Sequence, residues 1–332
     1  MARSTVTFEP RAEQMALWPS VSGNAINGLG EKDAGRPRPI YWHEPERTPH
    51  GPLQRWFYQQ SANNPLLVQA RANRQKIIDA PLGALAEQQV SLTPAAAVSL
   101  VKTAARDAGA DLVGIAQMRP EWVFEGFEVT QQWIVMIGVA HEYGAMSCAP
   151  RDPAAAEVIR QYARGNHIAK VVASAIRATG HDAKPHGGPF AGPVVLIPPA
   201  IECGFGELGK HGSIINRDFG SSFRLASVLT DLPLLADRRD VFGADDFCLN
   251  CRVCADACPP DAILHAKQMV RGTEKWYVDF DKCLPYFNET MGCGICLVVC
   301  PWGRPGMAAN LVRKMTGRLE RRSENRASGD AT

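Results

Sequence analysis

Eight of the ten cysteines in this chain lie in two blocks near its C-terminal end, and each block closes with a Cys-Pro pair. The first block reads C-x2-C-x2-C-x3-C-P, and the second reads C-x9-C-x2-C-x3-C-P. This pattern is typical of bacterial ferredoxins with two [4Fe-4S] clusters, in which the last cysteine of each block reaches the other cluster. The two expected ligand sets are Cys248, Cys251, Cys254 with Cys300, and Cys283, Cys293, Cys296 with Cys258.

Other uses of these cysteines fit less well. A disulfide framework is typical of small secreted chains, whereas this chain has 332 residues and its first residues show no secretory leader. Zinc sites use separated C-x2-C pairs without gaps closed by Cys-Pro. The sequence therefore predicts two cubane clusters and a reducing, cytoplasmic location.

Composition excludes several classes of function. The net charge is +2, which gives no general attraction to nucleic acid. The longest apolar runs, at 133–140 and 194–200, are far shorter than the roughly 20 residues that a bilayer span needs. We expect no nucleic-acid partner and no membrane span.

Four regions follow from composition and motif spacing. They are an aromatic N-terminal arm that wraps the protein (1–90), an α/β domain (91–242), a ferredoxin-like module (243–308) and a basic C-terminal tail (309–332). We expect Trp56, Phe57 and Tyr58 of the arm to pack on the main domain. The tail reads as a solvated or frayed end, or alternatively as a docking patch for an acidic electron donor.

The α/β domain gives the clearest secondary-structure signals. Thr93 can cap a helix that begins at Pro94 and ends at Gly109, with one apolar stripe. The other predictions are strands at 111–116, 133–140 and 194–197, a helix between 152 and 180, and a strand pair formed by 213–216 and 223–230. Helices alternate with strands, which predicts an α/β sandwich.

Several stretches of this segment and the module together resemble the catalytic core of corrinoid-dependent reductive dehalogenases. The matching stretches are 91–116, 133–146, 176–188, 203–234 and 248–302, in family order. The family is indicated more specifically by two motifs together, GELGKHG at 206–212 and TDLPL at 230–234, than by the cysteines alone. The resemblance implies an α+β protein, in which base-off cobalamin lies between a nitroreductase-like α/β domain and the two-cluster module.

The resemblance also implies site residues. The family's catalytic tyrosine falls on Tyr162, counted back from Ile176-Arg177, and the basic residue of its G-E-L-G-[RK] motif falls on Lys210. Replacing carbon-halogen by carbon-hydrogen needs two electrons and one proton, which a phenol can supply, and a nearby ammonium would stabilise the phenolate. Without the resemblance, an ordinary helix tyrosine and a solvated lysine are the simpler interpretations.

Further residues are expected to contact the corrinoid rather than to bind its metal. These are Gly187, Gly188, His211, Gly212, Phe219, Gly220 and Arg224. Some family members carry asparagine where this chain has Gly188, so that polar contact is missing here. His186 and His211 are expected to be polar pocket lining.

The leading hypothesis is a reductive dehalogenase that acts on a small organohalide and receives electrons from an external ferredoxin, flavodoxin or reductase. One alternative is an epoxyqueuosine reductase-like enzyme acting on a tRNA base. Such an enzyme is expected to have a catalytic aspartate before the glycine motif, and 193–203 contains none. The other alternative is a non-catalytic iron-sulfur subunit that only relays electrons.

Overall fold

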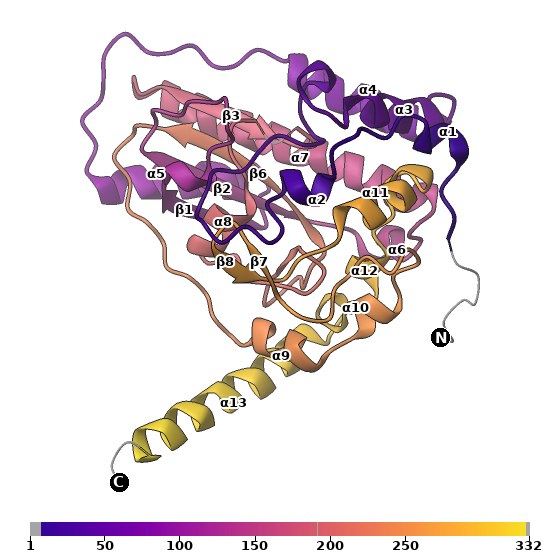
Figure 1. Ribbon diagram of the computed structural model, residues 1–332. Coiled ribbons are helices and arrows are strands. Elements are labelled where there is room, and N and C mark those ends of the chain that lie inside the picture. Colours follow the sequence, from indigo (N-terminus) through magenta and orange to yellow (C-terminus); the bar gives the residue numbers. More distant parts are fainter. Residues whose placement is uncertain (1–7, 191, 330–332) are drawn as a thin grey trace.

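A computed structural model describes residues 8–190 and 192–329 (Figure 1). The ends of the predicted arm and tail, 1–7 and 330–332, lie outside the described residues. The α-helices are α1 (Ala12–Met15), α2 (Gly23–Ile26), α3 (Gly51–Gln60), α4 (Pro65–Asp79), α5 (Pro94–Asp107), α6 (Tyr143–Met146), α7 (Asp152–Arg177), α8 (Ile197–Glu202), α9 (Ala244–Asn250), α10 (Val253–Asp256), α11 (Phe280–Glu289), α12 (Ile295–Val298) and α13 (Ala308–Gly329). The strands are β1 (Leu112–Gln117), β2 (Trp133–Ala140), β3 (Ala183–Gly187), β4 (Glu207–Leu208), β5 (Ile214–Ile215), β6 (Phe223–Thr230), β7 (Gln268–Val270) and β8 (Thr273–Lys275).

A four-stranded sheet in the order β1-β2-β6-β3 forms the centre of the fold. All of its neighbouring strands are antiparallel. β2 pairs with β6 from Trp133 opposite Thr230 to Ala140 opposite Phe223. The strands predicted at 111–116, 133–140 and 223–230 are confirmed, the first within one residue. The protein mixes helices and sheet as predicted, but its helices do not connect parallel strands.

One predicted strand, at 194–197, and one predicted strand pairing are wrong. Val194 makes only an isolated bridge with Val123, and α8 begins at Ile197 because two prolines suit the first turn of a helix better than a strand ladder. β5 pairs with β4 instead of β6. β3 was not predicted, because it contains Pro185, which a strand tolerates only at the edge of a sheet.

Helices cover one face of the sheet. α5 and α7 pack there in a core that includes Val101, Ile168 and Val172. The predicted cap of α5 is confirmed, because the Thr93 hydroxyl accepts a hydrogen bond from the Ala96 N–H. α4 packs on α7 from outside, and α8 lies on the opposite face of the sheet. The 26-residue α7 is therefore the element that connects the sheet core to the N-terminal helices.

The N-terminal segment joins the sheet domain to the cysteine module. Trp56 and Phe57 are buried, as predicted. Phe57 of α3 stacks on Phe287 of α11 with 5.6 Å between ring centroids. The Tyr41 hydroxyl donates a hydrogen bond of 2.6 Å to Asn288 Oδ1 of the same helix. These contacts place α3 and α4 above α7 and α11 in Figure 1.

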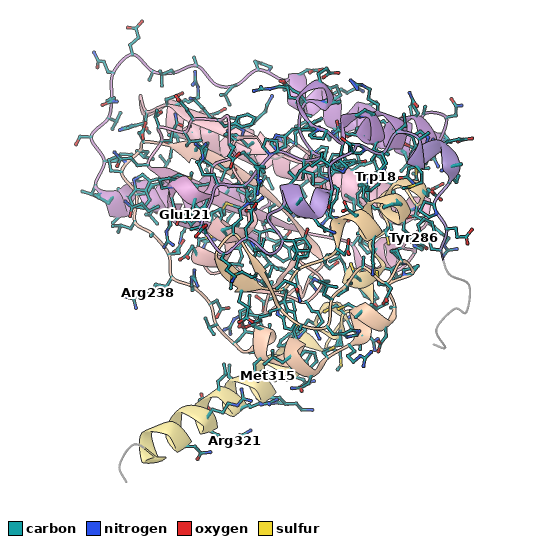
Figure 2. The ribbon with its side chains drawn as sticks, viewed as in Figure 1. Trp18, Glu121, Arg238, Tyr286, Met315 and Arg321 are labelled. Carbon is teal, nitrogen blue, oxygen red and sulfur yellow. The ribbon has the colours of Figure 1, made fainter. Side chains whose placement is uncertain are left out.

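The C-terminal segment forms the helix α13, so the prediction of a frayed end is wrong for its described part. Met315 is buried among the side chains of Phe242 and Trp302. Asp246 forms ion pairs with Arg318 and Arg322. Figure 2 shows Met315 where the helix meets the body and Arg321 on the part that projects. None of the described helices is long and apolar enough to cross a membrane.

Candidate active site

The eight cysteines lie close together, and the electrostatic interactions between their thiols run mostly within the two crossed sets that remain the prediction of the motif. Burial raises the pKa of the Cys248 thiol to about 12, and the charges of Cys300, Cys254 and Cys251 act in the same direction. These four residues are the first set. The pKa of the Cys283 thiol is likewise raised to about 12, chiefly by burial and then by Cys293 and Cys258. Cys296 interacts with these three thiols and also with Cys254 of the first set, and with the former three it makes up the predicted second set.

The donors are eight thiols, the ligands that [4Fe-4S] clusters take. In the part of the chain that the structure describes, no three His, Cys, Asp or Glu side chains converge closely enough to hold one metal ion. A cubane places an iron atom between each thiolate and the cluster centre, so its four cysteines stand further apart than the ligands of one zinc ion.

Backbone groups point at sulfur atoms in both sets. The Lys210 N–H lies 3.5 Å from Cys248 Sγ, and the Ala262 N–H lies 3.4 Å from Cys258 Sγ. Hydrogen bonds to cluster sulfurs are one of the levers by which a protein sets the reduction potential.

A cavity of about 460 Å³ opens beside the second set. All four cysteines of that set line it, whereas none of the first set does. The facing wall consists of side chains from α3, α4, α7 and β6, together with Pro189 and residues 211–213. No aspartate or glutamate is among its lining residues. The cavity thus separates the cysteine module from α7.

Tyr162 of α7 lines this cavity, and three neighbours fix its position. The Arg224 guanidinium lies 5.6 Å from the centre of the Tyr162 ring. A Cβ atom at Gly188 would overlap the same ring, so the glycine makes room for it. Asn166 Nδ2 donates hydrogen bonds to the carbonyl oxygens of Tyr162, at 2.8 Å, and Gly188, at 3.1 Å. Asn166 therefore ties the helix to the end of β3, a role that no sequence motif indicated.

Lys210 lies in a different environment. Its side chain is 1% exposed, and its ammonium donates a hydrogen bond of 2.7 Å to the Cys251 carbonyl. The same ammonium is 4.9 Å from the centre of the Trp276 ring. Among the described residues we find no contact between Lys210 and Tyr162, and Lys210 does not line the cavity. The structure does not bring the two predicted catalytic residues together.

Some of the predicted corrinoid contacts line the cavity and others do not. His211, Gly212 and Arg224 line the cavity. Gly187 lies against Asn166, where a Cβ atom would overlap the amide. Phe219 lines a separate pocket with His141, and Gly220 packs against the backbone of Trp302 and Gly303. Phe219 and Gly220 therefore lie away from the cavity, and Gly187 and Gly188 are not among its lining residues either.

His211 presents a defined tautomer at the cavity. Its Nδ1 accepts a hydrogen bond of 3.2 Å from the Ser213 N–H, so in the neutral ring the proton is on Nε2. Burial lowers the pKa of His211 to about 4, which keeps the ring neutral near pH 7. Within the described residues, Nε2 is buried without a hydrogen-bond partner. A ligand in the cavity could accept this hydrogen bond.

The N-terminal helices also contribute to the cavity. Tyr58 of α3, which was expected to pack on the main domain, lines it, and so do Arg71 and Arg74 of α4, which sequence reasoning missed. The two arginines are one helical turn apart, and α4 packs on α7, which carries Tyr162. A helix from Asn64 onward, with Pro65 at its first position, is the sequence signal that could have located them.

Comparison with protein families supports the reading of the cysteines. Residues 247–304 match the family described as a 4Fe-4S dicluster domain. The match includes both cysteine blocks and little else of the chain.

Curated relatives match a longer part of the chain. A tetrachloroethene reductive dehalogenase of Desulfitobacterium hafniense is 31% identical over 210 residues, which are 59% of this chain and 37% of that protein. An epoxyqueuosine reductase of Cyclobacterium marinum is 34% identical over 138 residues, which are 36% of this chain and 41% of the relative. The chain therefore spans well under half the length of each of these two relatives.

Solved structures extend the similarity to nearly the whole chain. The catabolic reductive dehalogenase NpRdhA, in complex with 3-bromo-4-hydroxybenzoic acid, has a TM-score of 0.75 and 24% identity, covering 98% of this chain and 48% of the other. A reductive dehalogenase described in connection with B12-dependent dehalogenation gives a TM-score of 0.73 and 24% identity, covering 97% and 50%. The predicted resemblance is confirmed: this chain has the fold of a reductive dehalogenase, a 4Fe-4S dicluster domain, and relatives in sequence among the reductive dehalogenases.

Proposed function

We propose that this chain is a cobalamin-dependent reductive dehalogenase that replaces a carbon-halogen bond of a small organohalide by carbon-hydrogen. The observation that carries the proposal is the cavity with the second cysteine set on one wall and Tyr162 on the other. A reaction that consumes two electrons and one proton needs an electron source and a proton source at one place. The names of the sequence relatives support the same reaction class.

The residues around the cavity suit a corrinoid, and we propose that the sheet domain is the nitroreductase-like domain expected to bind it. A corrinoid carries peripheral amides, which pair with donors such as His211 Nε2 and Arg224 Nε, both buried without partners among the described residues. Gly212 lines the cavity beside them. When bound, the cobalt of the corrinoid supplies the reducing power at the carbon-halogen bond. His211 donates from a neutral ring and is not proposed as a cobalt ligand.

Tyr162 is the proposed proton donor. Its phenol lies in a cavity lined by apolar side chains of α7, including Val158 and Ile159, which limit the access of water to the reacting carbon. In the overall change, the carbon gains the Tyr162 proton and two electrons, and the halogen leaves as halide. The guanidinium of Arg224 is placed to stabilise the phenolate.

Lys210 has a different proposed part from the one expected from its motif. Its ammonium lies beside Cys251 and Trp276, so its charge acts on the first cysteine set. A fixed positive charge stabilises the reduced, more negative form of a cluster. We propose that Lys210 tunes electron entry and that Arg224 takes the place of the ammonium near Tyr162.

Electrons are proposed to come from an external ferredoxin, flavodoxin or reductase by way of the first set. Cys251 is partly exposed, and its neighbours Leu249 and Val253 are exposed apolar side chains. The cluster held by the second set, which lines the cavity, is then the last iron-sulfur cluster on the electron-transfer path to the reacting carbon.

The test is an anaerobic reconstitution with iron, sulfide and cobalamin, followed by assays with halophenols and a reduced donor. We expect about eight irons and one cobalamin per chain, with halide release that depends on both. Iron without retained cobalamin would support the electron-relay alternative. Cobalamin with no halide release, but with reduction of epoxyqueuosine in tRNA, would support the other alternative.

A further inference from the structure

The C-terminal helix α13 carries a stripe of basic side chains. Its 22 residues include six arginines and lysines and only two glutamates. Lys314, Arg318, Arg321 and Arg322 follow the spacing i, i+4, i+7, i+8, which places them along one side of the helix. The side chains of Arg318 and Arg322 are 41% and 50% exposed, and Lys314 and Arg321 are exposed as well. These four residues are called the basic stripe.

Only part of the charge of the basic stripe is neutralised. Asp246 of α9 forms ion pairs with both Arg318 and Arg322, so one carboxylate meets two guanidinium groups. For Lys314 and Arg321 we find no ion pair with any residue that the structure describes, and Figure 2 shows Arg321 on the part of α13 that projects from the body. Four positive charges therefore meet one carboxylate, and the surplus faces solvent.

The pairing with Asp246 fixes the basic stripe beside the first cysteine set. α9 carries both Asp246 and Cys248, and it ends at Asn250, directly before Cys251. Met315 of α13 packs in one buried cluster with Cys248 and Cys300. Cys251 is partly exposed. The positive charge therefore lies on the side of the module where a ligand of the first cluster reaches the surface.

Two exposed apolar side chains lie next to Cys251 in the chain. Leu249 is 53% exposed and Val253 is 37% exposed. Arg252, between Cys251 and Val253, pairs with Asp256, so these two residues add no net charge. A small apolar contact beside a surface of one charge sign suits a transient complex, because charge steers the encounter while little surface area is buried.

We infer that the basic stripe is the docking surface for an acidic electron-carrier protein, which delivers its electron to the first cluster beside Cys251. This inference rests on the proposed function, because it identifies the surface that receives the external donor. The surplus of positive charge selects a partner with an acidic surface, and the exposure of Cys251 makes that partner an electron carrier. In this step the carrier is oxidised by one electron and the first cluster is reduced by one electron, without any change in bonds.

Stopped-flow reduction of the reconstituted chain by an acidic [2Fe-2S] ferredoxin, without any organohalide, tests the inference. The test variant combines Lys314→Glu with Arg321→Glu, and it keeps Arg318 and Arg322, which hold α13 on α9. We expect its second-order rate constant at low salt to fall at least about tenfold, since steering by charge raises association rates by about 10- to 1000-fold. The wild-type rate should fall as the ionic strength rises, and the rate of the variant should depend on salt much less.

A variant that combines Lys76→Glu with Arg106→Glu is the matched control. It changes the net charge by the same amount at exposed positions of α4 and α5, which lie away from α13 in Figure 1, and it should be reduced at the wild-type rate. Reduced methyl viologen, a small cation, should reduce both variants at least as fast as the wild type, which shows that their clusters are intact. Calorimetric titration with oxidised ferredoxin measures the affinity apart from electron transfer and should rank the three proteins in the same order.

Two outcomes would overturn the inference. An equal loss of rate in the test and control variants would assign the effect to net charge instead of to the basic stripe. An unchanged rate and affinity in the test variant would place the carrier elsewhere, and a loss of tRNA binding by that same variant would make the stripe a nucleic-acid surface. The proposed function fails separately, through absence of halide release from every organohalide, because cluster reduction and ferredoxin binding are measured without substrate.

Discussion

The two cysteine sets meet the rest of the molecule in different ways. Cys248 and Cys300 of the first set are buried in a cluster with Phe242, Trp302 and Met315. The four cysteines of the second set line the cavity opposite Tyr162. Two cysteines of the first set are thus enclosed by packing while Cys251 is partly exposed at the surface, and the whole second set faces a ligand site. The comparison supports the proposed direction, in which electrons enter at the first set and leave at the second.

The largest expected difference in halide release is between two variants that each lose one cysteine ligand, one from each set. Cys258→Ala should abolish halide release with every donor, because the cluster beside the cavity is lost. Cys251→Ala should abolish release with a protein donor but retain it with titanium(III) citrate, a small reductant that can reach the second cluster directly. Each variant should keep about four of eight irons.

The prediction is checked by measuring halide release by both variants with each of the two donors. Iron analysis of the same samples gives the number of irons retained. Identical behaviour of the two variants with both donors would contradict the proposed direction. Circular dichroism of each variant controls for loss of the module's fold.

The substitution Tyr162→Phe tests the role of the opposite wall of the cavity and should slow halide release. Removing a general acid costs about 10²- to 10⁴-fold in rate. Cobalamin binding and iron content should stay at the wild-type level, because Phe keeps the packing of the ring against Gly188. Tyr143→Phe is the control, since Tyr143 is 38% exposed and does not line this cavity. Unchanged halide release by Tyr162→Phe would remove the proposed acid.

The substitution Lys210→Met distinguishes two roles for this lysine, which are tuning of the first cluster and, as the motif implies, stabilisation of the Tyr162 phenolate. Loss of the ammonium beside Cys251 should make the reduction potential of the first cluster more negative, and it should change halide release with titanium(III) citrate by less than about tenfold. A potentiometric titration followed by electron paramagnetic resonance gives the potential. Lys267→Met is a matched control, because Lys267 lies 5.5 Å from the same Trp276 ring but is paired with Asp245.

A large loss of activity in Lys210→Met at an unchanged potential would instead support the role expected from the motif. That result would mean that Lys210 reaches Tyr162 in a conformation different from the one described here.

How much could be predicted from sequence differs between the two walls. On the cysteine wall, most ligands of a set lie within one short block of the sequence. The spacing of the cysteines within the two blocks is therefore enough to predict the crossed sets. The other wall is assembled by α4 packing on α7, a long-range contact without a local signal, so Arg71 and Arg74 were missed. The motif located Lys210 in the chain, but the direction of a loop side chain depends on its partners, here Cys251 and Trp276.

The smallest expected effect concerns the packing around the first set. Asp246→Asn removes the charge that pairs with Arg318 and Arg322 of α13, and such partly exposed pairs contribute about 1 kcal/mol or less to the free energy of unfolding. Because Met315 of the same helix packs beside Cys248 and Cys300, a loosened α13 should expose the first cluster and leave the second unaffected. Iron release to a chelator should become faster for half of the iron only. Equal acceleration for all of the iron would show that α13 does not protect one set in preference to the other.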